Sequence, residues 1–437
     1  MHWWQRIASF DVAARRFLAG AFLIELGHAF LWTLQNLYVR AVGFGEAEAG
    51  QVLSMNTIGI VLATFPAAYM YDRLGPRRSL SLACVAATVG MVGMACSTAL
   101  PVLKAFAVLN GAAFCLHNVV AAPFIMSIAR PHERSHLFGA EFASHTSAQT
   151  VGPLLAGWLA AHSLVGWLPG ADAAGLDAAQ LLRGALIVGA LLGLAGTLFY
   201  LRLPDTATVA PDTERRTLFG ILRKDRRALW VKLAIPNCII GIGAGLTIPF
   251  INLYLTDRFA LDTDALGLVM AAAAATMTVA VLAVPAVVAR WGFVRATITS
   301  ELLSLPFFAL LAFTTDVRVA VVAVIIRQAL MNVCHPIWRN FMMEITPPLW
   351  RASVNSVTML AWNAGWGFSV VAGGLLIEGT AGLLGTGTDG YAVPIVLTIA
   401  LYLAAIGFEA WFFWGRRGLG VATTGETLSA PHEGQID

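Results

Sequence analysis

Long apolar segments alternate with short polar ones along the whole chain. An apolar segment of about 20 residues is long enough to cross a bilayer as one helix, and no segment has the two-residue alternation of a half-buried strand. The pattern therefore predicts an all-α polytopic membrane protein. Its twelve transmembrane helices are expected at roughly 17–39, 50–71, 79–98, 102–128, 137–162, 182–203, 229–255, 266–289, 297–314, 319–343, 352–377 and 391–414.

The composition agrees with this prediction, because 58% of the residues are hydrophobic and only 12% are charged. Soluble domains are nearer half apolar and a quarter charged. The net charge of +3 indicates no particular partner, and no nucleic-acid-binding feature, phosphate-binding loop or cofactor motif is found. Energy for function is therefore expected from an ion gradient or from downhill flow. Residues 1–16 lack the apolar core of a signal peptide and are expected to form a short interfacial helix.

The distribution of basic residues predicts the orientation in the membrane. With the N-terminus inside, 20 of the 28 lysines and arginines fall in interior segments, five in exterior segments and three within helices. Cytoplasmic loops carry such an excess of Lys and Arg. Both termini are therefore expected in the cytoplasm, with the protein in the inner (plasma) membrane.

The two halves of the sequence resemble each other at a nearly constant spacing of half the chain, here called the repeat offset. We expect an N-terminal six-helix bundle (1–203), a cytoplasmic central loop (204–228), a C-terminal six-helix bundle (229–415) and a disordered tail (416–437). Six matches in order indicate a duplication, because chance would not keep one spacing. They are Asn36–Tyr38 with Asn252–Tyr254, Gly50 with Gly267, Gly75 with Gly292, Arg78 with Arg295, Arg134 with Arg351, and Gly157 with Gly374.

The stretch YDRLGPRR, residues 71–78, places four charges between two apolar segments. Gly75 permits a tight turn and Pro76 fixes φ just beyond it. The stretch resembles the signature loop of the major facilitator superfamily, although Ala68 stands where a glycine is usual. The resemblance implies two six-helix bundles and a latch of the outward-facing state. Gating residues are then Asp72, Arg73, Gly75, Arg77, Arg78 and, in the next cytoplasmic loop, Arg134.

A second resemblance to the same superfamily is partial. Gly139, Gly152, Pro153 and Gly157 fit a pattern typical of its antiporters, and packing of small residues explains the same stretch equally well. An arginine that its exporters usually carry is replaced by Ala107. The resemblance implies a secondary transporter of a small organic solute. Proton-coupled export by antiport is the preferred interpretation. Proton-coupled uptake or an uncoupled facilitator of an organic anion is the alternative.

Polar residues form stripes on several predicted transmembrane helices. A charge at the bilayer centre costs about 2.5–3.5 kcal/mol on insertion scales, so these stripes should face a shared wet cavity. The candidate substrate and proton pathway consists of Glu25, His28, Trp32, Gln35, Asn36, His117, Asn118, Glu141, His145, Asn252, Arg327, Asn332, His335, Arg339, Trp362 and Trp366.

Glu25 is expected either to carry the coupling proton, to hold a cationic group, or merely to pair with His28. Arg327 would hold an anion or pair with an acid. The spacing between His117 and His335 is close to the repeat offset, so we expect them at equivalent places on opposite walls of the cavity. Imidazoles with aromatic walls suit a flat or partly apolar solute with a polar or anionic group.

The sequence leaves two other classes of protein as alternatives. HERSH, with His132, Glu133 and His136, matches the zinc-protease pattern His-Glu-x-x-His. Phe142 occupies the third ligand position, so no metal site is expected there and an enzyme is not favoured. A transporter-like sensor that moves nothing is the other class. The expected partners are a small solute, protons and the lipid bilayer, and we expect a monomer.

Overall fold

The computed structural model describes residues 10–129, 134–162, 177–204, 227–346, 351–381 and 390–414. Within these ranges the regular structure is helical and contains no strand. Ten of the described helices are long and apolar enough to cross a membrane. The more polar α5 (Arg134–His162) and the first part of α3 (Glu46–Ala95) bring the crossings to the predicted twelve. The chain is therefore a multi-pass helical membrane protein.

The first six crossings form the N-terminal bundle. Helix α3 crosses twice, because Gly75 takes the left-handed φ of 75° that other residues avoid, and Pro76 begins the second part. The charged turn predicted at residues 71–78 is confirmed. The helices of this bundle are α2 (Val12–Ala41), α3 (Glu46–Ala95), α4 (Leu100–Ile128), α5 (Arg134–His162) and α6 (Ala178–Tyr200).

The other six crossings form the C-terminal bundle. Two of the expected helices are broken, which the apolar pattern does not predict. Pro249 lies in the short 3-10 segment η3 between α8 and α9, and the chain breaks again at Ala283, between α10 and α11. Gly292, with φ 73°, forms the turn between α11 and α12 in the loop that the sequence predicts. The bundle consists of α8 (Arg227–Thr247), η3 (Ile248–Phe250), α9 (Ile251–Phe259), α10 (Thr263–Leu282), α11 (Val284–Trp291), α12 (Phe293–Phe313), α13 (Val317–Ile345), α14 (Arg351–Gly379) and α15 (Ala392–Phe413).

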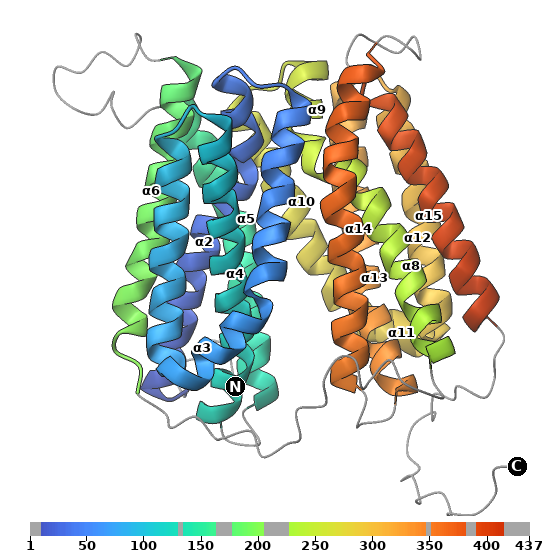
Figure 1. Cartoon of the computed structure of the whole chain (residues 1–437). Helices are drawn as coiled ribbons and strands as arrows, with labels where there is room; N and C mark the ends of the chain where they lie inside the picture. Colours follow the sequence, from blue (N-terminus) through green and yellow to red (C-terminus); the bar gives the residue numbers. More distant parts are fainter. Residues whose placement is uncertain are drawn as a thin grey trace, which may run out of the picture.

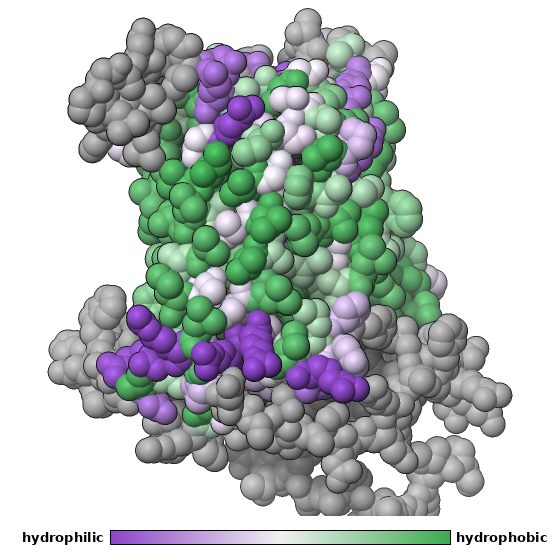
Figure 2. Space-filling view, turned by 60° about the vertical axis from the view of Figure 1, so that its left-hand side comes forward, coloured by the Kyte–Doolittle hydropathy of each residue, from purple (hydrophilic) through white to green (hydrophobic). Residues whose placement is uncertain are grey.

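The two bundles stand side by side (Figure 1). Helix α2 begins and α15 ends in the lower part of the view, and this side of the molecule is here called the terminal end. The other side, which carries the turn between α2 and α3, is here called the opposite end. The ribbons of the two bundles approach each other toward the opposite end and diverge toward the terminal end (Figure 1). Figure 2 shows an apolar belt between polar rims, as expected for a surface that contacts lipid.

The duplication seen in the sequence recurs in side-chain contacts. The Tyr38 hydroxyl donates to the carbonyl of Ala95 at 2.6 Å, and the Tyr254 hydroxyl donates to the carbonyl of Leu311 at 2.8 Å. The two donors are separated by the repeat offset, and so are the two acceptors. The two bundles are therefore pseudo-symmetric in detail. The predicted central loop and tail fall almost entirely outside the described residues, so the domain limits stay a prediction.

Candidate functional site

Two seams join the bundles, α5 against α10 and α3 against α14. In the first seam Gly157 lies against the carbonyl of Thr263, and in the second Gly374 lies against the carbonyl of Glu46. The two contacts are equivalent, because both the glycines and the carbonyls are related by the repeat offset. A Cβ on either glycine would collide with backbone, so both seams depend on the missing side chain. Both lie in the half of the molecule near the opposite end.

Only part of the helix-packing motif predicted in α5 makes close contacts in the structure. Gly152 packs on Ala29 of α2, and the carbonyl of Pro153 abuts Gly267 across the seam. Gly139 has nothing within 4 Å of a Cβ placed on it. The expectation of close packing at Gly139 is therefore wrong for this conformation, because this position lies nearer the terminal end, where the bundles separate.

Two asparagines clamp the bundles together. The Asn36 amide donates to the carbonyl of Pro249, and the Asn252 amide donates to the carbonyl of Thr33 at 3.1 Å. The donors and the acceptors of these two contacts are again related by the repeat offset. Both asparagines are buried. We expected them to line the solute pathway, but here their hydrogen bonds are used to close it.

A polar cap completes the closure at the opposite end. Arg40 pairs with Glu46 of its own bundle and, at 3.1 Å, with Asp257 of the other. The Tyr391 hydroxyl donates to the same Asp257 carboxylate at 2.6 Å. Together with the seams and the asparagine clamp, this cap closes the opposite end.

Below the closure, the N-terminal bundle holds a buried acid beside two imidazoles. Glu25 of α2 has a side chain only 5% exposed, and its carboxylate lies 3.1 Å from His145 Nδ1 and 3.8 Å from His117 Nδ1. His117 also lies 2.8 Å from the Tyr200 hydroxyl. The partners of Glu25 therefore come from α5 and α4, and the pair with His28 that the sequence suggested is not formed.

His28 occupies a different position. Its ring meets Phe114 edge-on at 5.1 Å, and both of its ring nitrogens are buried without a hydrogen-bond partner. A neutral imidazole offers one donor and one acceptor. Buried polar atoms normally have hydrogen-bond partners. The two ring nitrogens of His28 are therefore available to hydrogen-bond a water molecule or a bound solute.

A row of aromatic rings crosses from one bundle to the other. Trp32 of α2 stacks on Trp366 of α14 at 6.3 Å, and Trp366 stacks on Trp362 at 6.0 Å. His335 of α13 meets Trp362 edge-on at 5.1 Å. Trp32 remains 56% exposed although it lies at the interface of the bundles. The structure thus brings these four predicted pathway residues together.

His117 and His335 are not equivalent, contrary to our expectation. At the repeat offset of the glycine matches, His117 corresponds to Cys334, and both are buried, whereas His335 corresponds to Asn118, and both are exposed. One residue turns a helix by about 100°, so the extra step in the spacing of the two histidines moves the side chain to another face. His117 therefore belongs to the core of its bundle rather than to a cavity wall.

Arg327 does not face the pathway. It is 1% exposed in the C-terminal bundle, its guanidinium lies 4.9 Å from the centre of the Phe308 ring, and it donates to Gln328. No acid pairs with it among the described residues. The acid partner is therefore not formed, while the Nε of Arg327 is buried without a hydrogen-bond partner and the anion site stays a prediction. Asn332 is half-buried and donates to the carbonyl of Gln328 at 2.8 Å, and Arg339 is exposed.

Three further predicted pathway residues have modest roles in this conformation. Gln35 accepts a hydrogen bond from Asn56 at 3.2 Å, while its own amide nitrogen is buried without a partner. Asn118 is exposed and donates to the carbonyl of Phe114 at 2.9 Å. Glu141 is half-buried on α5, one turn before His145.

Sequence reasoning missed a pair of buried glutamates in the C-terminal bundle. Glu301 of α12 and Glu409 of α15 are 2% and 1% exposed and are hydrogen-bonded to each other. A hydrogen bond between two carboxyl groups requires a proton on at least one of them. Each glutamate is isolated in an apolar segment, which is the signal that should have identified them.

The predicted gating residues lie at the terminal end, around the turn at Gly75. Asp72 is half-exposed, and the Arg73 guanidinium lies 5.4 Å from the centre of the Tyr69 ring. Arg77 is half-buried and Arg78 exposed. The side chain of Arg134 lies outside the described residues, as do His132 and Glu133 of the zinc-protease pattern.

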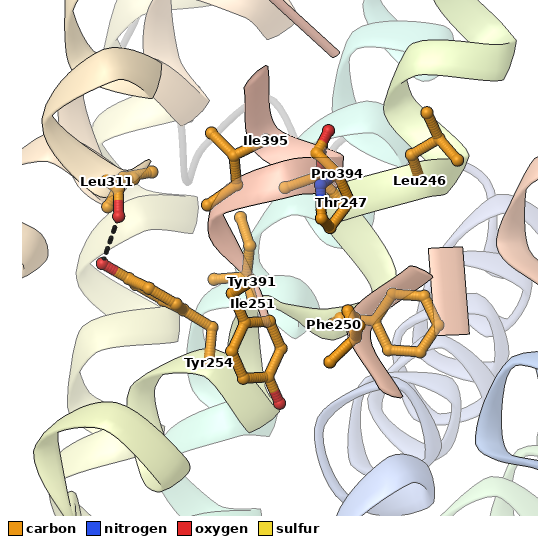
Figure 3. A pocket seen from close by; sticks show the side chains of 10 residues that line it. Leu246, Thr247, Phe250, Ile251, Tyr254, Leu311, Tyr391, Pro394 and Ile395 are labelled. Atoms are coloured by element: carbon orange, nitrogen blue, oxygen red, sulfur yellow. Dashed lines mark hydrogen bonds between the residues drawn. The ribbon is translucent and has the colours of Figure 1, made fainter. Parts of the chain in front are cut away.

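A small cavity in the C-terminal bundle is a poor candidate for a solute site. It lies among α8, α9 and α15, lined by residues that include Phe250, Tyr254 and Tyr391 (Figure 3). Its volume of ≈ 10 Å³ is at the lower limit for one water molecule. The solute site is therefore better sought between the bundles.

Twelve crossings in two pseudo-symmetric bundles, joined in the described residues by contacts near one end, form the architecture of a membrane transport protein. The chain belongs to the Major Facilitator Superfamily, whose sequence profile matches residues 17–370. No curated protein matches the chain. The zinc-protease alternative receives no support from these comparisons.

Solved structures of other transporters share the fold. The nucleoside transporter NupG is 17% identical with a TM-score of 0.71, over 92% of this chain and 99% of that one. A bacterial homologue of the human lysosomal transporter Spinster, inward-facing and unoccupied, is 14% identical with a TM-score of 0.74, over 91% and 95%. A D-xylose-proton symporter is 14% identical with a TM-score of 0.72, over 94% and 99%. At these identities the likeness shows the fold alone.

Proposed function

We propose that the chain is a secondary active transporter that exchanges protons for a small organic solute and exports it by alternating access. The observation that carries this proposal is the Glu25 cluster. Glu25 is buried, whereas His145 beside it has a side chain 38% exposed. A half-exposed imidazole against a buried carboxylate offers a path by which a proton can reach the interior.

The closure pattern supports alternating access. In this conformation the seams, the asparagine clamp and the polar cap all join the bundles at the opposite end. A solute bound below them would be released only after these contacts break and the terminal end closes. Asp72 and the arginines around Gly75 lie where they can latch the terminal end in that second state.

The excess of basic residues supports a cytoplasmic location of the terminal end. The protein is then a monomer in the inner (plasma) membrane with both termini inside, and the conformation described here faces inward. Release on the other side, coupled to proton entry, gives export.

Proton-coupled uptake is the second candidate. It is favoured by Ala107, which stands where the arginine of proton-exchanging exporters is expected. In uptake the same Glu25 would carry the proton in the direction of the solute.

The test is a flux measurement in liposomes that contain the purified protein and a trapped pH-sensitive dye. A solute selected by thermal shift is placed inside, with the external solution acidified. Exchange predicts solute efflux and acidification of the lumen together. Proton and solute moving in the same direction would establish symport, and solute movement without a pH change would refute coupling.

A further inference from the structure

One face of α2 carries four side chains that can contact a bound solute. Glu25, His28, Trp32 and Gln35 follow spacings of three and four residues, so they share one face of the helix. His28 and Gln35 lie about one turn on either side of Trp32, and both have buried nitrogen atoms without a hydrogen-bond partner. The exposed ring of Trp32 is therefore flanked by unused polar groups.

The aromatic row gives the shape of what can bind. Trp32 and Trp366 are inclined by 26°, and Trp366 and Trp362 by 24°, so the three rings are close to parallel. Near-parallel rings with one member exposed favour offset stacking of a further planar ring. A flat, rigid solute gains this contact, whereas a flexible aliphatic one does not.

The charges near the row give the polarity of its head group. Glu25 is buried on the same helical face as Trp32, and a buried charge interacts more strongly than an exposed one. Arg327 lies inside the C-terminal bundle against Phe308, away from the aromatic row, so its charge does not act on a head group beside Trp32. Arg339 lies one turn beyond His335 but is exposed, where solvent screens its charge. An N–H donor or cation is therefore favoured over an anion.

We propose that the pathway between the bundles binds a planar aromatic or heteroaromatic solute with a cationic or N–H donor head, its ring on Trp32 and Trp366 and its head toward His28 and Glu25. This substrate class rests on the proposed transport function. A cationic or N–H donor head replaces the anionic group that the sequence analysis allowed as one alternative.

The test uses four probes that differ in one feature each. Tryptamine, tryptophol and indole-3-acetate share one ring and carry an ammonium, a hydroxyl and a carboxylate, and cyclohexylethylamine keeps the ammonium without the aromatic ring. Binding to the purified full chain is measured by calorimetry. We expect tryptamine to bind on the order of 10- to 100-fold more tightly than indole-3-acetate, and about 5-fold or more tightly than cyclohexylethylamine.

Variants locate the site. Trp32→Leu and Trp366→Leu should each weaken tryptamine binding by about 5- to 10-fold. Trp411→Leu is the matched control, because Trp411 of α15 is 75% exposed and stacks on Phe412, outside the aromatic row. Glu25→Gln should weaken tryptamine binding more than tryptophol binding, which separates loss of charge from loss of fold.

Three results would overturn the substrate class. They are equal or tighter binding of indole-3-acetate, equal binding of cyclohexylethylamine, and no binding of any indole to folded protein. The liposome experiment is independent: tryptamine that binds but moves without protons would refute coupling and leave the substrate class standing. Proton-coupled movement of a non-aromatic solute with no indole binding would do the reverse.

Discussion

The two bundles share a backbone but differ in their buried acids. In the N-terminal bundle Glu25 lies beside two imidazoles, one of them half-exposed. In the C-terminal bundle Glu301 and Glu409 face each other, and Arg327 lies against a phenylalanine ring instead of pairing with either. The first arrangement connects an acid to solvent, and the second seals two acids together.

The contacts between the bundles, unlike the buried acids, are the same in both halves. The glycine seams and the asparagine clamp each consist of two contacts related by the repeat offset. Pseudo-symmetry is thus kept where the bundles touch and lost around their buried acids. This difference suggests that closure is shared equally by the two halves, while proton coupling belongs to the first.

The largest expected effect comes from removing the charge of the first acid. Glu25→Gln should abolish solute accumulation driven by a pH gradient, because the amide cannot cycle a proton, yet leave exchange of labelled solute measurable at saturating solute concentration. The measurement is both fluxes in liposomes. Survival of gradient-driven accumulation would move the proton to Glu141 or to a histidine.

Glu301→Gln is the matched control in the C-terminal bundle. It removes one carboxyl group that is equally buried but sealed from the pathway, so gradient-driven accumulation should persist at a measurable rate. If Glu301→Gln abolished accumulation as completely as Glu25→Gln, the division of roles between the bundles would fail.

The next effect concerns the shared seams. Gly157→Val and Gly374→Val each place a side chain against a backbone carbonyl of the other bundle. Overpacking typically costs about 1–3 kcal/mol, so both variants should shift the protein toward the state open at the opposite end. Hydrogen exchange at the start of α3 and α10 would detect the shift. Gly139→Val, at a position with open space, should leave exchange unchanged, and a shift in only one seam variant would contradict shared closure.

Much of the fold was predictable from the sequence. Helix length and hydrophobicity located the twelve crossings, and the glycine turn at Gly75 was confirmed because left-handed backbone strongly favours that residue. The break in the seventh crossing was missed, although Pro249 was visible. A proline within an apolar segment does not by itself reveal whether the helix kinks or ends.

The candidate site was harder to predict, because helical spacing gives a face but not what that face meets. The stripe of α2 was predicted, yet Glu25 meets helices α4 and α5 rather than His28. The position equivalent to His335 is Asn118 rather than His117. This difference of one residue moves the side chain to another face of the helix. Glu301 and Glu409 lie far apart in the sequence on separate helices, and no local pattern connects them.

A smaller effect is expected from the second acidic pair. At low pH the shared proton holds Glu301 and Glu409 together, whereas its loss at higher pH leaves two buried like charges. Stability of the wild-type protein should therefore fall as pH rises through that loss, by about 1–3 kcal/mol. In Glu409→Gln the amide can donate to Glu301 at any pH, so the fall should be reduced. Melting temperatures across pH measure this, with the exposed Glu344→Gln as control. Equal pH profiles for wild type and Glu409→Gln would contradict a shared proton.

The smallest effect is expected from the asparagine clamp. Asn36→Ala and Asn252→Ala each remove one hydrogen bond to a backbone carbonyl of the other bundle, worth about 0.5–1.5 kcal/mol. Because the two contacts are equivalent, both variants should weaken closure of the opposite end by similar amounts in hydrogen exchange. Asn36 Nδ2 also lies 3.5 Å from Asn252 Oδ1, so the double variant should lose less than the sum of the two. Strict additivity would mean that the clamp is two separate contacts, and a large effect in one variant alone would show that closure, like proton binding, is asymmetric.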